Sequence, residues 1–172
     1  MYEKILPAPN TRRSLVLLRS PRIKVMERIE FEKIVDSIIR RCGEKIVAIA
    51  PFGSVARGEA TEISDIDLFI VVKDFPKSLE RRRKLYDAAY RELPKGGDVT
   101  VIDIDEEELF TQDLEVTPLL LNIAWDAEIL HEPGGKLTEL LTNIRGAIER
   151  AGLERYRTPD GKYGWKPRSP NP

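Results

Sequence analysis

The chain has 172 residues, a length that fits one globular domain with extra residues at its ends. Hydrophobic residues make up 41% of it and charged residues 33%, a composition that can fill a core and differs from that of intrinsically disordered chains. The 28 lysines and arginines are balanced by 29 aspartates and glutamates, so net charge does not favour binding to nucleic acid or to an anionic membrane.

Cysteine and histidine are too rare for several classes of site. The single cysteine excludes an intramolecular disulfide and a cysteine-clustered zinc site, and the single histidine excludes a histidine-rich metal site. No apolar run approaches the roughly 20 residues that cross a bilayer, so we expect no membrane-spanning segment. Residues 1–27 are basic and lack the apolar core of a secretion signal, and we therefore expect a cytoplasmic protein.

The first predicted elements are a helix and two strands. Apolar residues at helical spacing predict a helix over 28–42, and the apolar, β-branched run 45–52 predicts a buried strand. Residues 65–72 first alternate acids with aliphatic residues and then become wholly apolar. This change is typical of a second strand whose far end enters a core.

The middle of the chain is predicted to form a helix, a strand and a short helix. Residues 78–93 carry apolar side chains on one helical face, and the basic run 81–84 lies on the other, where we expect it to be exposed to solvent. Contact between this run and nucleic acid is an option that we do not favour. Residues 98–104 alternate as a third strand does, and the acidic run 105–108 begins a short helix.

The last predicted elements are a helix over 118–125 capped by Thr117, a short fourth strand over 127–132 and a helix over 135–151. Residues 154–172 contain four prolines, so we expect a tail, disordered or docked, without lasting regular structure. Its interleaved aromatic and basic side chains are also suited to stacking on a nucleotide. The predicted organisation is an N-terminal extension over 1–27, a folded domain over 28–153 and a C-terminal tail over 154–172.

The most specific pattern in the sequence joins the first two predicted strands. Gly53-Ser54 is followed, after ten residues, by Asp65-x-Asp67. Because alternate residues of a strand share a face, the carboxylates of Asp65 and Asp67 converge. Two such charges repel unless a hard cation lies between them, and Mg²⁺ typically combines one or two carboxylates with substrate phosphates. The pair therefore predicts Mg²⁺ and a polyphosphate ligand, against the alternative of two solvated aspartates on an edge strand.

The glycine-serine turn supplies features that suit a phosphate. Gly53 lets the backbone approach a phosphate closely, and the hydroxyl of Ser54 can donate a hydrogen bond to it. Arg57 follows about one turn later, where its guanidinium can hold phosphate oxygens by paired hydrogen bonds. The alternative for Arg57 is a solvated loop arginine.

This segment resembles the signature of the DNA polymerase β-like nucleotidyltransferase superfamily, in its minimal single-domain branch. The resemblance covers residues 45–105 and extends to the helix and strand predicted over 118–132. It implies an α/β (α+β) fold with a mixed β-sheet of about four strands flanked by helices. It also implies two Mg²⁺ ions and transfer of a nucleoside monophosphate from a nucleoside triphosphate, with ATP as the default donor and pyrophosphate as the leaving group.

The resemblance also implies a third acid on a later strand, which ligates the second metal and helps to deprotonate the acceptor hydroxyl. Asp98 is the candidate, because it opens the third predicted strand and precedes an aliphatic run. Asp103 is the competitor, although its offset of five residues places it on the opposite face of the strand. The metal-ligand set implied in this way is Asp65, Asp67 and Asp98.

The acceptor is not fixed by the sequence. Minimal members of the superfamily resemble antitoxins that act beside a HEPN-family partner and transfer AMP to a tyrosine of that toxin, so a HEPN-type protein is the predicted partner. Small molecules and RNA 3′ ends are further options. The alternative from another class is a non-catalytic nucleotide- or partner-binding module on the same fold, which labelled ATP would distinguish from a transferase.

Overall fold

The computed structural model describes residues 25–61 and 64–169. Within that part of the chain, no helix has the length and apolarity needed to cross a bilayer. The elements in chain order are α2 (Val25–Cys42), η1 (Gly43–Lys45), β1 (Ile46–Phe52), α3 (Gly53–Ala56), β2 (Ile66–Val72), α4 (Leu79–Tyr90), β3 (Val99–Asp105), α5 (Glu106–Leu109), α6 (Pro118–Asp126), α7 (Lys136–Arg150), β4 (Leu153–Arg157) and β5 (Tyr163–Pro167).

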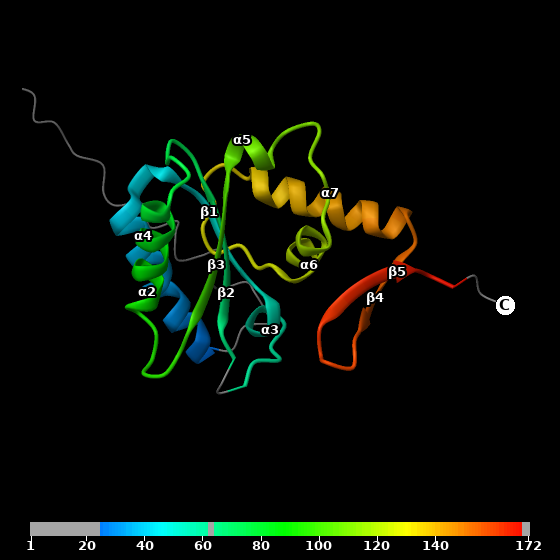
Figure 1. The fold of residues 1–172 in the computed structure, drawn as a ribbon, viewed down its shortest axis with the longest axis horizontal. Helices are drawn as coiled ribbons and strands as arrows, with labels where there is room; N and C mark the ends of the chain where they lie inside the picture. The colour runs from blue at the N-terminus through cyan, green and yellow to red at the C-terminus, as the bar shows by residue number, and fades with distance from the viewer. Residues whose placement is uncertain (1–24, 62–63, 170–172) are drawn as a thin grey trace, which may run out of the picture.

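A three-stranded sheet in the order β1-β2-β3 lies at the centre of the fold (Figure 1). β1 pairs with β2 in antiparallel orientation, and β2 pairs with β3 in parallel orientation. The register places Asp67 of β2 opposite Phe52 of β1 and opposite Thr100 of β3. The predicted fold class, a mixed sheet flanked by helices, is confirmed.

Helices cover both faces of the sheet and bury a separate apolar cluster on each. Alternate residues of β2 face opposite sides, so that Leu68 and Ile70 pack with α2 and α4 while Phe69 and Val71 pack with α6 and α7. Burial of each such side chain contributes about 1.5–3 kcal/mol. Because Asp67 has the parity of Phe69, its side chain belongs to the α6 side of the sheet.

The predicted helices and the first three predicted strands are confirmed, with ends that shift by a few residues. The cap of α6 is also found where the sequence predicts it. The side chain of Thr117 accepts a hydrogen bond from the amide of Leu120, and Pro118 occupies the first turn.

The fourth strand predicted over 127–132 is wrong, because this segment forms only an isolated bridge between His131 and Ile49 of β1. The amides of Glu128 and Leu130 do donate to carbonyls of β1, at 3.0 Å each. At the end of the segment, the carboxylate of Glu132 accepts hydrogen bonds from the amide and hydroxyl of Thr138 in the first turn of α7.

The predicted exposure of the basic run 81–84 is wrong for Arg81, which is fully buried. Its Nε donates to Asp103 at 2.8 Å, and its Nη1 donates to Asp105 at 2.8 Å and to the carbonyl of Phe75 at 2.5 Å. The reason is that α4 packs on the face of β3 from which both aspartates project. The remaining residues of the run are exposed, as expected.

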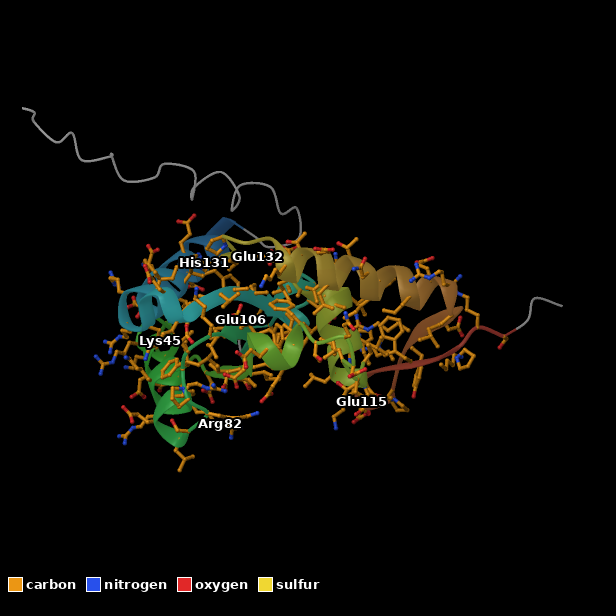
Figure 2. All side chains as sticks on the ribbon, turned by 90° about the horizontal axis from the view of Figure 1, so that it is seen from above. Lys45, Arg82, Glu106, Glu115, His131 and Glu132 are labelled. Carbon is orange, nitrogen blue, oxygen red and sulfur yellow. The ribbon has the colours of Figure 1, made fainter. Side chains whose placement is uncertain are left out.

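The expectation that 154–172 lacks regular structure is wrong, because β4 and β5 form an antiparallel hairpin. Its prolines stand where a missing amide costs no ladder hydrogen bond: Pro159 lies in the turn, and Pro167 is the last residue of β5. Figures 1 and 2 both place the hairpin at the end of the molecule opposite α2 and α4. The predicted N-terminal extension lies outside the described residues up to residue 24.

Candidate active site

The turn between β1 and α3 is built around Gly53. This residue has a φ of +72°, and a Cβ added to it would overlap the carboxylate of Asp67. Only glycine therefore lets the turn lie against that carboxylate. Ser54 follows on the first turn of α3, where its carbonyl accepts a hydrogen bond from the amide of Glu59 at 2.9 Å.

Asp65 directly precedes β2, and Asp67 is the second residue of that strand. Asp65 is exposed, whereas Asp67 is half-buried. Burial raises the pKa of Asp67, and the nearby charge of Asp65 raises it further, while the positive charge of Arg57 opposes both effects. The negative charge of Asp65 therefore acts on Asp67, while the role of the two carboxylates as metal ligands stays a prediction.

The chemistry of this donor set fits a hard divalent cation. Both side chains offer carboxylate oxygens, and the pKa of Asp67 is raised first by burial and then by the negative charge of Asp65, two effects that a bound cation would offset. Mg²⁺ bound by two carboxylates takes its remaining ligands from water and substrate phosphates, so Asp65 and Asp67 need no third protein ligand for one ion.

Arg57 is held by two carboxylates instead of projecting into solvent. Its Nη1 donates to Asp126 at 2.7 Å, and its Nε donates to Glu59 at 2.9 Å. Its side chain is 18% exposed, which disagrees with the alternative of a solvated loop arginine. The amide of Arg57 donates to the carbonyl of Gly53 at 3.1 Å, so Arg57 belongs to the turn that lies against Asp67, and its positive charge opposes the rise in the pKa of that carboxyl.

The backbone of Asp98 lies beside β2, whereas its carboxylate is hydrogen-bonded to Tyr86 of α4. Its carbonyl accepts a hydrogen bond from the amide of Ile66 at 3.0 Å. Its carboxylate accepts from the hydroxyl of Tyr86 on α4 at 3.2 Å and from the amide of Val99 at 2.8 Å. Across residues 25–61 and 64–169, no three His, Cys, Asp or Glu side chains are grouped closely enough to hold one metal ion. The role of Asp98 as third acid therefore stays a prediction.

Asp103 lies on the face of β3 that packs on α4, where it forms an ion pair with Arg81 at 2.6 Å. This is the face opposite to that of Asp67, as its offset from Asp98 predicts. The buried ion pair occupies the carboxylate of Asp103, which argues against this residue as a metal ligand.

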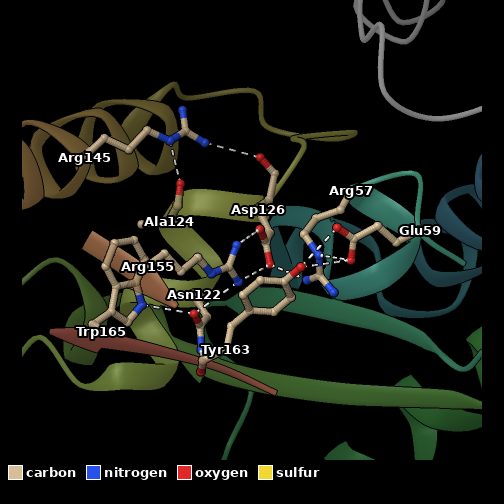
Figure 3. A network of polar contacts seen from close by, with 10 residues as sticks. Arg57, Glu59, Asn122, Ala124, Asp126, Arg145, Arg155, Tyr163 and Trp165 are labelled. Atoms are coloured by element: carbon tan, nitrogen blue, oxygen red, sulfur yellow. Dashed lines mark hydrogen bonds and ion pairs between the residues drawn. The ribbon is translucent and has the colours of Figure 1, made fainter. Parts of the chain in front are cut away.

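Sequence reasoning missed Asp126, the last residue of α6, whose side chain is only 1% exposed. Figure 3 shows it between Arg57 and Arg155. Arg155 of β4 donates to both of its oxygens, at 2.6 and 2.9 Å. The available signal was an acid at the end of a helix in which every other residue except Asn122 is apolar, because a charge on such a helix needs a partner if it is buried.

Residues 28–120 match the sequence profile of a family described as "Nucleotidyltransferase domain". The match spans more than half of the chain and includes the Gly53 turn, the Asp65–Asp67 pair and all three strands of the central sheet. The chain belongs to the nucleotidyltransferase domain family. The predicted resemblance to nucleotidyltransferases is thereby confirmed, and this nucleotidyltransferase domain is an enzyme.

Two similar proteins come from Methanocaldococcus jannaschii. "Putative protein adenylyltransferase MJ1305" is 27% identical over 131 residues, which cover 73% of this chain and 88% of that protein. "Putative protein adenylyltransferase MJ0141" is 37% identical over 62 residues, which cover 36% of this chain and 59% of that protein. The first similarity extends beyond the family match and includes most of the relative's length.

Solved structures similar to this nucleotidyltransferase domain include two toxin–antitoxin complexes. One, described as a toxin-antitoxin with AMP-PNP, gives a TM-score of 0.49 at 18% identity and covers 69% of this chain and 87% of that one. The other is a tri-AMPylated Shewanella oneidensis HEPN toxin in complex with MNT antitoxin. It gives a TM-score of 0.48 at 16% identity and covers 73% of this chain and 88% of that one. What those complexes bind is a property of those proteins.

Proposed function

We propose that this nucleotidyltransferase transfers AMP from ATP, in the presence of Mg²⁺, to a hydroxyl group of a protein partner. The observation that carries the proposal is the Asp65–Asp67 pair held against the Gly53 turn, with the guanidinium of Arg57 beside it. This arrangement joins oxygen ligands for a cation with a backbone that a phosphate can approach and a positive charge that a phosphate can bind.

Each residue of the site has a proposed task. Asp65 and Asp67 would hold Mg²⁺, which when bound neutralises negative charge on the triphosphate. Arg57 and the hydroxyl of Ser54 orient the phosphate oxygens, and Gly53 keeps the space that a side chain would fill. The acceptor oxygen forms a bond to the α-phosphorus, the bond from that phosphorus to the bridging oxygen breaks, and pyrophosphate leaves.

Asp98 is retained in the proposal as the acid that receives the proton of the acceptor hydroxyl and ligates a second Mg²⁺. Its backbone already lies beside the strand of the pair, since the amide of Ile66 donates to its carbonyl. Its Oδ1 accepts hydrogen bonds from the hydroxyl of Tyr86 and the amide of Val99, which this oxygen would give up if it turned toward a metal. Both donors are neutral and the side chain of Asp98 is exposed, so these hydrogen bonds contribute little net free energy.

A protein acceptor is favoured over nucleic acid and small molecules. The two relatives from M. jannaschii are named as protein adenylyltransferases. The formal net charge of −1 gives no support for nucleic acid as the acceptor. We propose a HEPN-type toxin as the partner, on the resemblance of the Gly53-Ser54 and Asp65-x-Asp67 motif to that of minimal antitoxins.

The test uses the full chain, ATP labelled at the α-phosphate and the protein that co-purifies with the chain from its own cells. We expect label on the partner with Mg²⁺ and none with EDTA. Asp67→Asn should abolish labelling with a nearly unchanged melting temperature, because catalysis here is mainly electrostatic. The matched control is Asp36→Asn, which makes the same change on an exposed position of α2 and should label as the wild type does.

Two results would contradict the proposal. If the wild-type chain transfers no label to the partner although it binds MgATP, that protein is not the acceptor and the proposed transfer to it is wrong. If Asp67→Asn labels the partner at the wild-type rate, Asp67 does not ligate a required ion.

A further inference from the structure

The β4–β5 hairpin lies outside residues 28–120, which carry the family match, yet its side chains reach the candidate active site. Arg155 of β4 and Arg57 after α3 both bind the carboxylate of Asp126 (Figure 3). The hairpin is anchored on α6 by a hydrogen bond of 3.0 Å from Trp165 to Asn122 and by an edge-to-face contact between Trp165 and Trp125. The hairpin and the site are thus one connected unit.

The guanidinium of Arg57 is restrained in three directions. Asp126 accepts from its Nη1, Glu59 accepts from its Nε, and its central carbon lies 4.5 Å from the ring centroid of Tyr163. Tyr163 of β5 in turn donates from its hydroxyl to Glu59 at 3.1 Å. The hairpin therefore holds Arg57 directly through the ring of Tyr163 and indirectly through Arg155.

The balance of charge explains what Arg155 does for Arg57. Asp126 is 1% exposed and its carboxylate is shared between two arginines, so Arg155 supplies part of the compensation that a buried carboxylate requires. Without Arg155, Arg57 would be the remaining ion-pair partner of Asp126 among the ion pairs of residues 25–61 and 64–169, while it also pairs with Glu59. Less of its positive charge would then act on a phosphate ligand beside Asp67.

We propose that the β4–β5 hairpin completes the active site by aiming Arg57 at the triphosphate of ATP, with Arg155, Asp126 and Tyr163 as positioning residues. This inference rests on the proposed function. It differs from the expectation that the aromatic side chains of residues 154–172 stack on a nucleotide, because the rings of Tyr163 and Trp165 pack on arginines and on Trp125.

The first experiment compares Arg155→Ala with Lys166→Ala. Lys166 lies on the same hairpin and is 53% exposed. Among the ion pairs of the described residues, its partner is Glu154 on the opposite strand of the hairpin. Its variant therefore removes the same charge without removing a contact to Asp126. We expect Arg155→Ala to raise the KM for ATP and the Kd for MgATP about tenfold while kcat falls less than threefold. Lys166→Ala should change each quantity less than twofold.

The second experiment repeats the Arg155→Ala change in two other backgrounds. If Arg155 acts through Arg57, it should change the Kd for MgATP less than twofold in the Arg57→Ala background. If Arg155 acts by compensating Asp126, the Arg155→Ala/Asp126→Asn double variant should recover most of the melting temperature that Arg155→Ala loses. This recovery keeps the test valid even where the single variant is poorly folded.

The outcomes separate failure of the inference from failure of the proposed function. Equal loss of MgATP affinity on Arg155→Ala in the wild-type and Arg57→Ala backgrounds would overturn the inference, and so would an equal effect of Lys166→Ala. Absence of AMP transfer by the wild type would overturn the proposed function alone, because the Kd measured by calorimetry still tests the hairpin.

Discussion

Two buried arginine–aspartate centres lie on opposite faces of the same sheet. On one face, Arg81 binds Asp103 and Asp105 and is fully enclosed between α4 and β3. On the other, Arg57 and Arg155 share Asp126 between α6 and the hairpin. The residue types and the distances are alike, but the surroundings differ.

The difference lies in what each arginine can reach. Arg81 has no exposed surface, so its charge serves only the two aspartates and a carbonyl that it binds. Arg57 keeps 18% of its side chain exposed and acts on the half-buried carboxylate of Asp67. We therefore interpret the Arg81 centre as a structural ion-pair cluster that holds α4 on β3, and the Arg57 centre as part of the active site.

The largest expected effect is on stability, from Arg81→Ala. Removing Arg81 leaves the carboxylates of Asp103 and Asp105 without their buried partner, which costs about 3–5 kcal/mol of the free energy of unfolding. Urea unfolding measures this loss. Arg82→Ala is the control, since that side chain is 67% exposed and its variant should change the free energy by less than about 0.5 kcal/mol. A loss of less than about 1 kcal/mol in the free energy of unfolding of Arg81→Ala would contradict this structural role.

The next effect is on transfer, from Gly53→Ala. A Cβ at Gly53 displaces the carboxylate of Asp67, and a shift of that size costs about a hundredfold in rate. Gly135→Ala is a matched control, because Gly135 has nearly the same φ, +74°, and no atom lies within 4 Å of the position that its Cβ would take. Both variants should lose about 1–2 kcal/mol of stability through the left-handed backbone, and only Gly53→Ala should lose transfer. Equal rates for the two variants would show that the close approach is unimportant.

Most of the fold and the main pair of the site follow from local patterns. The spacing of apolar residues predicts β1, β2, β3 and their neighbouring helices, because helix and strand periodicity depend on residues close in sequence. The expected convergence of Asp65 and Asp67 is equally local, since it depends on the alternation of side chains along one extended segment; in the structure Asp67 lies in β2 and Asp65 directly precedes it.

The features that the sequence did not reveal depend on residues far apart in the chain. Arg57 and Asp126 are 69 positions apart, and the burial of Arg81 depends on which face of β3 packs on α4. The hairpin was hidden by its prolines, which break a strand only in its interior. Asp98 follows a glycine turn, so the direction of its carboxylate depends on the neighbouring Tyr86 and not on strand alternation.

A smaller effect, on the stability that the chain gains when MgATP binds, distinguishes Arg57 from Arg81. With MgATP at ten times its Kd, the wild type should gain about 1.4 kcal/mol of stability. Arg57→Lys, which cannot keep both hydrogen bonds in one plane, should bind about tenfold more weakly and gain only about 0.4 kcal/mol. Arg81→Lys starts from a lower stability but should gain the full amount. Unfolding with and without MgATP measures the gain, and EDTA should abolish it in every variant. A reduced gain in Arg81→Lys would remove the distinction between the two centres.

The smallest expected effect concerns Tyr86, whose hydroxyl donates to the carboxylate of Asp98. Tyr86→Phe removes this donor and increases the population in which Asp98 is free to turn toward Asp65, so we expect AMP transfer to rise about twofold. Tyr90→Phe is the control, because Tyr90 stacks on Tyr86 and is similarly exposed. In the Asp98→Asn background, which should itself transfer little, Tyr86→Phe should have no effect. If Tyr86→Phe slows transfer while Asp98→Asn leaves it intact, Asp98 is not the third acid, and the site operates with Asp65 and Asp67 as its carboxylate ligands.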